Sequence, residues 1–215
     1  MGRQEEISDY VYESATLNYS HSFLLPTVRK IVLGLGLEEE RRRLFDLGCG
    51  NGSVGNEFHK LGFDVTGVDP SSQGVTLAKA HYPHLKIAQG SAYDELAATY
   101  GQFPVVTSLE VVEHTYFPHK YASTLFSLVQ PGGVAVVSTP YHGYLKNLAL
   151  ALSGAMDQHF SPLWDHGHIK FWSRATLGSL LKQAGFSDVV FRRVGRIPAL
   201  AKSLIAVARR DGTPS

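Results

Sequence analysis

The sequence DLGCGNG at residues 46–52 continues a short apolar run and decides the fold. Its three glycines let the backbone turn tightly and let a ligand approach the main chain. The stretch 54–61 then reads as a helix, which would offer its N-terminal amides and its dipole to that ligand. A second apolar strand, 63–68, ends at Asp69, 23 positions after Asp46. A carboxylate at that strand end can accept both hydroxyls of a ribose, so the pattern predicts a nucleoside site.

Two other interpretations of the glycine loop are weaker. A nicotinamide dinucleotide site is typical of the longer G-x-G-x-x-G spacing, whereas here the glycines fall at 48, 50 and 52. The acid before the loop, Asp46, also favours a cationic ligand over a pyrophosphate. A turn that binds nothing is the remaining alternative, and the second carboxylate at the end of the next strand argues against it.

Strands and helices alternate along the rest of the chain. Apolar runs predict strands at 44–47, 63–68, 85–88, 103–109 and 134–138, and helices fit between them at 54–61, 72–81 and 120–129. This alternation predicts a parallel sheet with helices on both faces. Ser173 can cap a further helix, 175–183, and two more strands, 189–194 and 204–208, follow without a helix between them. We therefore expect these two strands to form an antiparallel hairpin at one edge of the sheet.

The length of 215 residues suits a single domain, 1–215. Residues 1–40, which include an apolar-periodic stretch, predict a helical lid, and residues 41–139 form the cofactor-binding core. Residues 140–171 are rich in histidine and aromatic side chains. A long connection in a compact domain is more often functional than idle, so we expect an inserted cover over the acceptor. Residues 172–215 supply the C-terminal helix and the strand hairpin.

Composition excludes several classes of protein. Hydrophobic residues make up 44% and charged residues 18% of the chain, as in globular proteins, and the net charge of +1 lacks the basic footprint of a nucleic-acid-binding protein. No apolar run reaches the ~18 residues that cross a bilayer, and the polar start shows no signal peptide. The single cysteine, Cys49, cannot form an intrachain disulfide and fits a reducing compartment. We expect a cytoplasmic protein that acts on a small molecule, and its oligomeric state stays open.

Residues 44–139 resemble the core of the class I S-adenosylmethionine-dependent methyltransferases. The matching parts are the first motif at 46–52, the acid Asp69, the loop at 90–92, the strand-four motif at 108–114 and the turn at 131–133. The resemblance implies a Rossmann-like, doubly wound α/β sheet of seven strands with the last strand antiparallel. It implies S-adenosyl-L-methionine as the cofactor, bound by Asp46, Gly48, Cys49, Gly50, Asn51, Gly52, Asp69, Pro70, Ser91, Ala92, Leu109 and Glu110.

The strand-four motif contains an E-x-x-E-H cluster, Glu110, Glu113 and His114, at the carboxyl end of the sheet, where ligands bind in such folds. Ubiquinone-type O-methyltransferases, which methylate catechols, resemble the chain in this cluster. Small-RNA 3′-terminal 2′-O-methyltransferases also resemble it, and in that group the cluster holds a metal. The first resemblance favours His166 as a further ligand and the second favours His168, which we prefer. The expected metal ligands are Glu110, Glu113, His114 and His168, which suit Mg²⁺, Mn²⁺ or Zn²⁺.

The acceptor hydroxyl needs activation, with or without a metal. A phenol with a pKa near ~10 is mostly protonated at neutral pH, and a bound cation would lower that pKa. Without a metal, His114 or His168 could act as the general base, or the cluster could simply bond backbone amides and line the site. The candidates for binding the substrate lie before the first strand and after the fifth: Tyr19, His21, Tyr141 and His142.

The expected reaction is O-methylation of a small hydroxylated acceptor, catechol-like or a sugar, with possible assistance from a divalent metal. An RNA ribose 2′-O-methyltransferase is one alternative, which the near-neutral charge disfavours and RNA binding at low salt would reveal. An N-methyltransferase of a small amine is another, and its rate would not respond to metal chelation. A catalytically silent binding module with the same fold would fail to bind S-adenosylmethionine.

Overall fold

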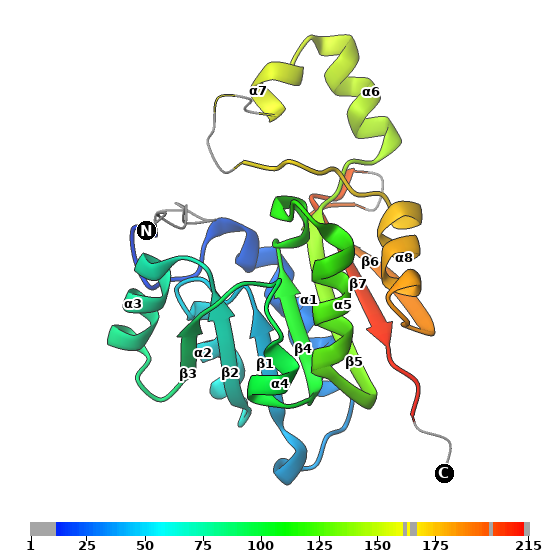
Figure 1. Cartoon of the computed structure of the whole chain (residues 1–215). Helices are drawn as coiled ribbons and strands as arrows, with labels where there is room; N and C mark the ends of the chain where they lie inside the picture. Colours follow the sequence, from blue (N-terminus) through cyan, green and yellow to red (C-terminus); the bar gives the residue numbers. More distant parts are fainter. Residues whose placement is uncertain (1–11, 161–162, 164–166, 198–199, 213–215) are drawn as a thin grey trace, which may run out of the picture.

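A mixed sheet of seven strands forms the centre of the computed structural model, which describes residues 12–160, 163, 167–197 and 200–212. The order across the sheet is β3-β2-β1-β4-β5-β7-β6 (Figure 1). The strands are β1 (Arg43–Leu47), β2 (Asp64–Asp69), β3 (Lys86–Gln89), β4 (Phe103–Leu109), β5 (Val129–Pro140), β6 (Asp188–Val194) and β7 (Ser203–Arg209). Strands β1 to β5 pair in parallel, and β7 is antiparallel to both of its neighbours. The class I sheet and the edge hairpin predicted from the sequence are confirmed.

Helices cover both faces of this sheet (Figure 1). One face carries α1 (Tyr19–Leu33), α2 (Ser53–His59) and α3 (Ser72–His81), and the other carries α4 (Leu96–Tyr100), α5 (Pro118–Leu128) and α8 (Arg174–Gln183). Two short 3-10 turns, η1 (Glu39–Arg41) and η2 (Val112–His114), precede β1 and follow β4. The side chain of Ser71 accepts the Gly74 N–H at the start of α3, and that of Ser173 accepts the Thr176 N–H, which confirms the predicted cap of α8.

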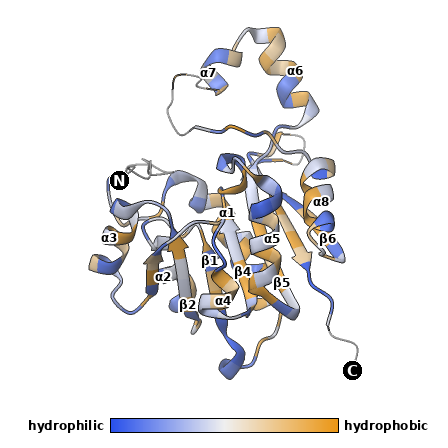
Figure 2. Ribbon diagram, in the orientation of Figure 1, coloured by the Kyte–Doolittle hydropathy of each residue, from blue (hydrophilic) through white to orange (hydrophobic). Residues whose placement is uncertain are grey.

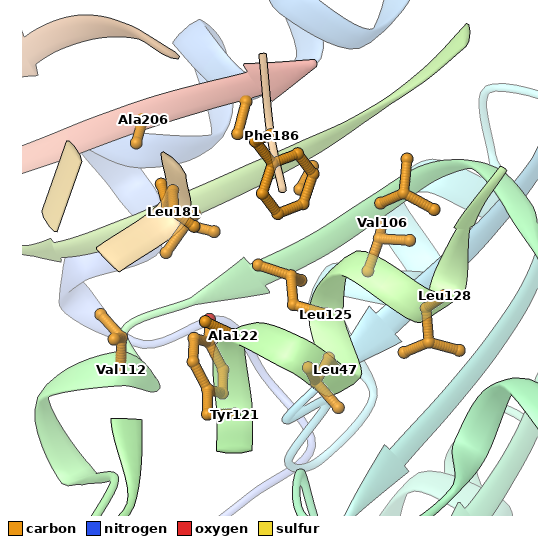
Figure 3. Packing of buried hydrophobic residues seen from close by; sticks show 14 of the residues in the cluster. Leu47, Val106, Val112, Tyr121, Ala122, Leu125, Leu128, Leu181, Phe186 and Ala206 are labelled. Carbon is orange, nitrogen blue, oxygen red and sulfur yellow. The ribbon is translucent and has the colours of Figure 1, made fainter. Parts of the chain in front are cut away.

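Two apolar layers hold the helices on the sheet. On one face Leu24, Val28 and Phe58 are fully buried, and on the other Tyr121 and Leu125 are (Figure 3). Every residue of β4 is buried, as expected for a central strand covered on both sides. Apolar residues accordingly concentrate in the strands, and polar residues colour the outer helix faces (Figure 2). This packing fixes the carboxyl ends of β1, β2 and β4 next to one another, which positions the site described below.

The structure differs from the predicted elements at a few boundaries. Helix α5 begins at Pro118, two residues before the predicted start, because proline is tolerated in the first helical turn. The helix predicted over 120–129 was wrong at its last residue, because Val129 pairs with Phe103 and begins β5. The short helix α4 was not predicted, since its five residues are too few to show a helical period.

The segment predicted as a cover folds into two helices, α6 (Tyr144–Ser153) and α7 (Met156–Phe160), which stand apart from the two helix layers (Figure 1). None of the residues of α6 is buried, and the large side chains of Tyr144, Leu145 and Leu152 are exposed. The rest of the cover includes residues 161–162 and 164–166, which lie outside the described residues. In the described part of the chain, no helix combines the length and the apolar character needed to cross a membrane.

Candidate active site

The glycine loop between β1 and α2 depends on glycine for its shape. Gly48, Gly50 and Gly52 have φ of +83°, +51° and +76°, a backbone conformation that residues with a Cβ rarely adopt. A Cβ atom on Gly48 would lie 2.4 Å from a methyl carbon of Val111, and one on Gly50 would lie 2.5 Å from the phenol oxygen of Tyr12. Glycine is therefore required at these positions both for conformation and for space.

Two buried carboxylates flank this loop. The Asp69 carboxylate accepts the Gly50 N–H at 2.8 Å and the Ser71 N–H at 2.9 Å, which ties the end of β2 to the loop. One Asp46 oxygen accepts the Thr107 hydroxyl at 2.7 Å, and the other is buried without a partner among the described residues. Burial raises the pKa of Asp69 and raises that of Asp46 to about 6. A cationic ligand beside these carboxylates would offset that cost of burial.

Residues 12–17 cross over the loop from the N-terminal side. The Asn51 side-chain amide donates to the carbonyls of Ser14 at 2.8 Å and Thr16 at 2.9 Å, and the Tyr82 hydroxyl donates to Ala15 O. Tyr12 exchanges two hydrogen bonds with the side chain of Gln73, at 2.9 and 2.7 Å. Sequence reasoning missed this segment, because isolated polar and aromatic residues before a helix give no pattern that names their partners.

The loop after β3 is bonded to the end of β2, where the Gly90 N–H donates to Asp69 O at 3.1 Å. The Ser91 N–H donates to Asp94 at 2.7 Å, and the Ser91 hydroxyl accepts the Tyr93 N–H at 3.2 Å. The Tyr93 hydroxyl accepts the N–H groups of Tyr116 and Phe117, so it joins this loop to the segment after β4. The predicted nucleoside residues Ser91, Ala92 and Pro70 therefore come to the same sheet edge as the glycine loop: Ala92 is half-buried against the core, and Pro70 O accepts from Gln89 at 3.1 Å.

Glu110 follows the buried Leu109 at the end of β4 and holds an unusual backbone conformation. Its φ is +57°, and it is alone in this among the non-glycine residues of the described part of the chain. Strained conformations of this kind gather at functional sites. The Ser138 hydroxyl accepts the Glu110 N–H at 3.0 Å and donates to its carboxylate at 2.7 Å. Burial raises the pKa of Glu110 to about 7, against the lowering effect of Ser138 and Ser203.

Glu113, His114 and His168 come together beyond Glu110. Each offers one ligand atom, and these atoms all lie within 4.8 Å of one another. Both Glu113 carboxylate oxygens are buried and lack a hydrogen-bond partner among the described residues. Burial first, and then repulsion from Glu110, hold the pKa of Glu113 well above its ordinary value. The structure does not bring Glu110 into this group, since its carboxylate bonds Ser138, and His166 lies outside the described residues.

Main-chain hydrogen bonds bring His168 to this place. The N–H groups of Ile169 and Lys170 both donate to Glu113 O at 3.0 Å. The indole N–H of Trp172 donates to Val112 O at 3.2 Å, and the Trp172 side chain is buried. The returning chain is thus fixed to η2 by three bonds, and the rings of His114 and His168 meet edge to face at 5.0 Å.

The four residues predicted to bind substrate lie in two places. Tyr19 is 73% exposed and hydrogen-bonds Lys202, while the His21 imidazole accepts the Asn18 N–H at 3.2 Å as part of the α1 cap. Burial lowers the pKa of His21 to about 4, so this ring is neutral. Tyr141 and His142 follow β5 on the way into the cover, where the His142 ring stacks on Phe160 with centroids 5.6 Å apart.

The donor set of Glu113, His114 and His168 fits a divalent cation. One carboxylate and two imidazoles are ligands that Mg²⁺, Mn²⁺ or Zn²⁺ accept, with zinc the best match for the two nitrogens. Both Glu113 oxygens are buried and lack a partner among the described residues, and a bound cation would offset the cost of burying this carboxylate.

Comparisons with known proteins place the chain among methyltransferases. The family model described as a methyltransferase domain matches residues 21–190. A ubiquinone biosynthesis O-methyltransferase of Cereibacter sphaeroides (strain ATCC 17025 / ATH 2.4.3) is 29% identical over 185 residues, which are 84% of this chain and 70% of that protein. One of Caulobacter sp. (strain K31) is 39% identical over 120 residues, which are 54% of this chain and 47% of that protein. The chain thus spans from about half to 70% of the length of these curated relatives.

Solved structures agree with this grouping at the level of the fold. The methyltransferase domain of bacterial CtHen1 has a TM-score of 0.64 at 22% identity, over 89% of this chain and 100% of that one. Magnesium protoporphyrin IX methyltransferase from Synechocystis PCC 6803, with bound SAH, has a TM-score of 0.64 at 20% identity, over 86% and 83%. The chain therefore belongs to the methyltransferase-domain family and has the fold of the class I S-adenosylmethionine-dependent methyltransferases.

Proposed function

We propose that this methyltransferase transfers the methyl group of S-adenosylmethionine to a hydroxyl oxygen of a small acceptor, catechol-like or a sugar. The observation that carries the proposal is the buried Glu113 carboxylate, which has no hydrogen-bond partner among the described residues and is grouped with His114 and His168. The group stands at the end of β4, on the same sheet edge as the glycine loop. The names of the curated relatives, ubiquinone biosynthesis O-methyltransferases, support oxygen rather than nitrogen as the acceptor atom.

The cofactor would lie over the glycine loop. Gly48, Gly50 and Gly52 would face its methionine part, with Cys49 and Asn51 shaping the turn, while Asp46 offers negative charge to its cationic groups. Asp69 would accept the ribose hydroxyls, and Pro70, Ser91, Ala92 and Leu109 would lie near the adenine. Support comes from the left-handed glycines and from the two buried carboxylates, whose raised pKa values favour a cation beside them.

The reaction needs an oxygen lone pair in line with the sulfonium carbon. As the oxygen–carbon bond forms, the carbon–sulfur bond breaks, its electron pair stays on sulfur, and the hydroxyl proton must leave. Burial lowers the pKa of His168 to about 4, so this imidazole is neutral at neutral pH and is a weak base. Without a metal, His114 or His168 would receive the hydroxyl proton. Tyr19, His21, Tyr141 and His142 remain proposed contacts of the acceptor.

A divalent cation, Mg²⁺, Mn²⁺ or Zn²⁺, would be held by Glu113, His114 and His168. The Glu110 carboxylate, which accepts the Ser138 hydroxyl, would add negative charge to this part of the site. When bound, it would lower the pKa of the acceptor hydroxyl and orient the attacking oxygen. The single buried cysteine supports a reducing, cytoplasmic setting as part of the same proposal.

The deciding experiment is thermal unfolding of EDTA-stripped protein with S-adenosylhomocysteine, Mg²⁺, Mn²⁺ and Zn²⁺, singly and together. A ligand that binds only the folded state raises the unfolding midpoint. We expect the cofactor product to raise it, and one metal to raise it further in the wild type but not in Glu113→Ala. Stabilisation by the cofactor product alone would remove the metal from the proposal. Methyl transfer to a catechol, measured with and without chelator, then tests the acceptor class.

A second candidate is methylation of an RNA ribose. It is favoured by the spacing of His168, four positions before Trp172, in which the chain resembles the small-RNA 2′-O-methyltransferases. The net charge of +1 disfavours it. Titration of a short RNA at low salt separates the two, since measurable binding that weakens with salt would favour RNA.

A further inference from the structure

A group of aromatic and imidazole rings lies together in the cover. The His142 ring stacks on Phe160 and meets Phe171 edge to face at 4.9 Å, and the His159 ring lies 5.5 Å from it. Both nitrogens of His142 and Nε2 of His159 are buried and have no hydrogen-bond partner among the described residues. A buried donor without a partner costs free energy that a ligand recovers when it bonds the donor.

Positive charge accompanies these imidazoles. Lys146, in the first turn of α6, is half-buried and donates to the Tyr141 carbonyl at 3.3 Å. Burial, and then repulsion from Arg196, lower the pKa of Lys146. Arg193 adds a guanidinium 6.0 Å above the Tyr141 ring.

No carboxylate of the described residues forms an ion pair with these cations. The ion pairs among the described residues join Arg29 and Lys60 to Glu57, and Lys86 to Asp64, and all of them lie outside the cover. Asp157 on α7 is exposed and joins none of them. Among the described residues, these cations therefore have no carboxylate partner and lie in the same segment as the unpartnered imidazoles.

We propose that the acceptor carries an anionic group, a carboxylate on its aromatic ring, which binds to His142, His159 and Lys146. This inference rests on the proposed methylation of a small hydroxylated acceptor and names a second point of contact for it. Phe160 and Phe171 would supply apolar walls for the ring, and the charged and imidazole N–H groups would supply charge-assisted hydrogen bonds to the carboxylate. The hydroxyl to be methylated would then face His114 and His168.

An acceptor explains these features better than an anionic lipid surface does. A lipid surface would contact the exposed side chains of α6, such as Tyr144 and Leu152, which point to solvent. The unpartnered imidazole nitrogens are buried, so a flat surface cannot reach them. A small acceptor, unlike a surface, would insert its carboxylate between these rings and keep its hydroxyl near His114 and His168.

The test compares three acceptors that differ in one group: 3,4-dihydroxybenzoate, its uncharged amide 3,4-dihydroxybenzamide, and catechol. For the wild type we expect kcat/KM for the acid to exceed that for the amide about 10-fold, the effect of one charge-assisted bond. In Lys146→Met and His142→Phe we expect this ratio to fall toward 1. Lys182→Met removes the same charge from an exposed position on α8 and should keep the ratio of the wild type.

Calorimetric binding of the acid and the amide to the wild type keeps the proposal testable if a variant fails to fold. Equal affinities and equal kcat/KM for acid and amide in the wild type would overturn it, as would a ratio retained in the Lys146→Met/His142→Phe double variant. Charge-selective binding lost in Lys146→Met, without methyl transfer to any acceptor, would support the anion site and reject the proposed function. The last measurement is binding of the protein to phosphatidylglycerol vesicles. If the wild type binds them, Lys146→Met does not, and the wild type does not discriminate between acid and amide, the positive charge serves lipid binding and the proposal is overturned.

Discussion

The site has a glycine-loop side and a cover side, and both lie at the carboxyl ends of the strands. The glycine-loop side consists of residues 46–52, Asp69 and residues 12–17. The cover side consists of Glu113, His114, His168 and the cover. On the glycine-loop side, Asn51 and Asp69 bond main-chain groups of the chain itself. On the cover side, the Glu113 carboxylate and the His142 ring have no such partners among the described residues. The polar groups of the first side are therefore held in place before a ligand binds, whereas those of the second side would gain partners only when a ligand binds. Substitutions on the two sides should separate binding of the cofactor from transfer to the acceptor.

The largest effect is expected for Gly48→Ala. The new methyl group meets Val111 at 2.4 Å in a left-handed backbone conformation, and we expect affinity for S-adenosylhomocysteine to fall about 100-fold or more, with a loss of stability of about 2–4 kcal/mol. Gly132→Ala is the matched control, because its φ is +77° and nothing lies within 4 Å of the added Cβ. Calorimetry and thermal unfolding measure both. Equal losses in the two variants would mean that backbone strain, rather than space in the loop, explains the effect.

The next effect belongs to the cover side. Glu113→Gln keeps the shape of the side chain and removes the buried charge, so we expect methyl transfer to fall about 100-fold. Affinity for S-adenosylhomocysteine should change less than about 2-fold, because Glu113 lies outside the glycine loop. Single-turnover rates and calorimetry provide the two readouts. A large loss of cofactor affinity would show that the two sides are not separable in this way.

Asp46→Asn should weaken cofactor binding and strengthen the fold without ligand. Burial raises the pKa of Asp46 to about 6, above its unfolded value near ~4. The folded state then binds more protons between these values, so the stability of the wild type decreases as pH rises from 4 to 6 and stays lower above that. At pH 7.5 we expect the variant to be more stable by about 1–3 kcal/mol and to bind the cofactor about 10-fold more weakly.

Unfolding midpoints of wild type and Asp46→Asn between pH 4 and 8, without ligand, check this sign. The curves should converge near pH 4, where the wild-type carboxyl is protonated. A constant difference across this range would assign the effect to the Thr107 hydrogen bond instead of to the buried charge.

The smallest effect is expected for Trp172→Phe. The ring stays apolar, but the bond to Val112 O is lost, so His168 is held less firmly against His114. We expect kcat to fall about 3- to 10-fold with little change in cofactor affinity. A merely structural role would lower the unfolding midpoint without moving kcat, and that result would contradict the positioning role.

The sequence predicted correctly those features of the fold and the site that depend on a local pattern of residues. The glycine spacing and Asp69 predicted the loop and the neighbouring strand end, and the alternation of apolar runs predicted the sheet, because each rests on a few adjacent residues. The hydrogen bonds from the Asn51 side chain to the carbonyls of residues 14 and 16 could not be predicted from the sequence, since the fold decides which groups a side-chain amide meets. The separation of Glu110 from Glu113 was equally hidden: a left-handed residue at 110 directs one carboxylate to Ser138, and the E-x-x-E-H pattern carries no sign of that.

Residues 12–17 bond partners that are synthesised after them, so they cannot take their place as soon as they are made. Their partners, Asn51, Gln73 and Tyr82, lie 35 to 67 positions later in the chain. During synthesis at about 5–20 residues per second, residues 12–17 must wait several seconds before α2 and α3 exist to receive them. The part of the site that is translated first can thus be seated only after α3 has been made, and a nascent chain released before α3 would present its glycine loop without this covering.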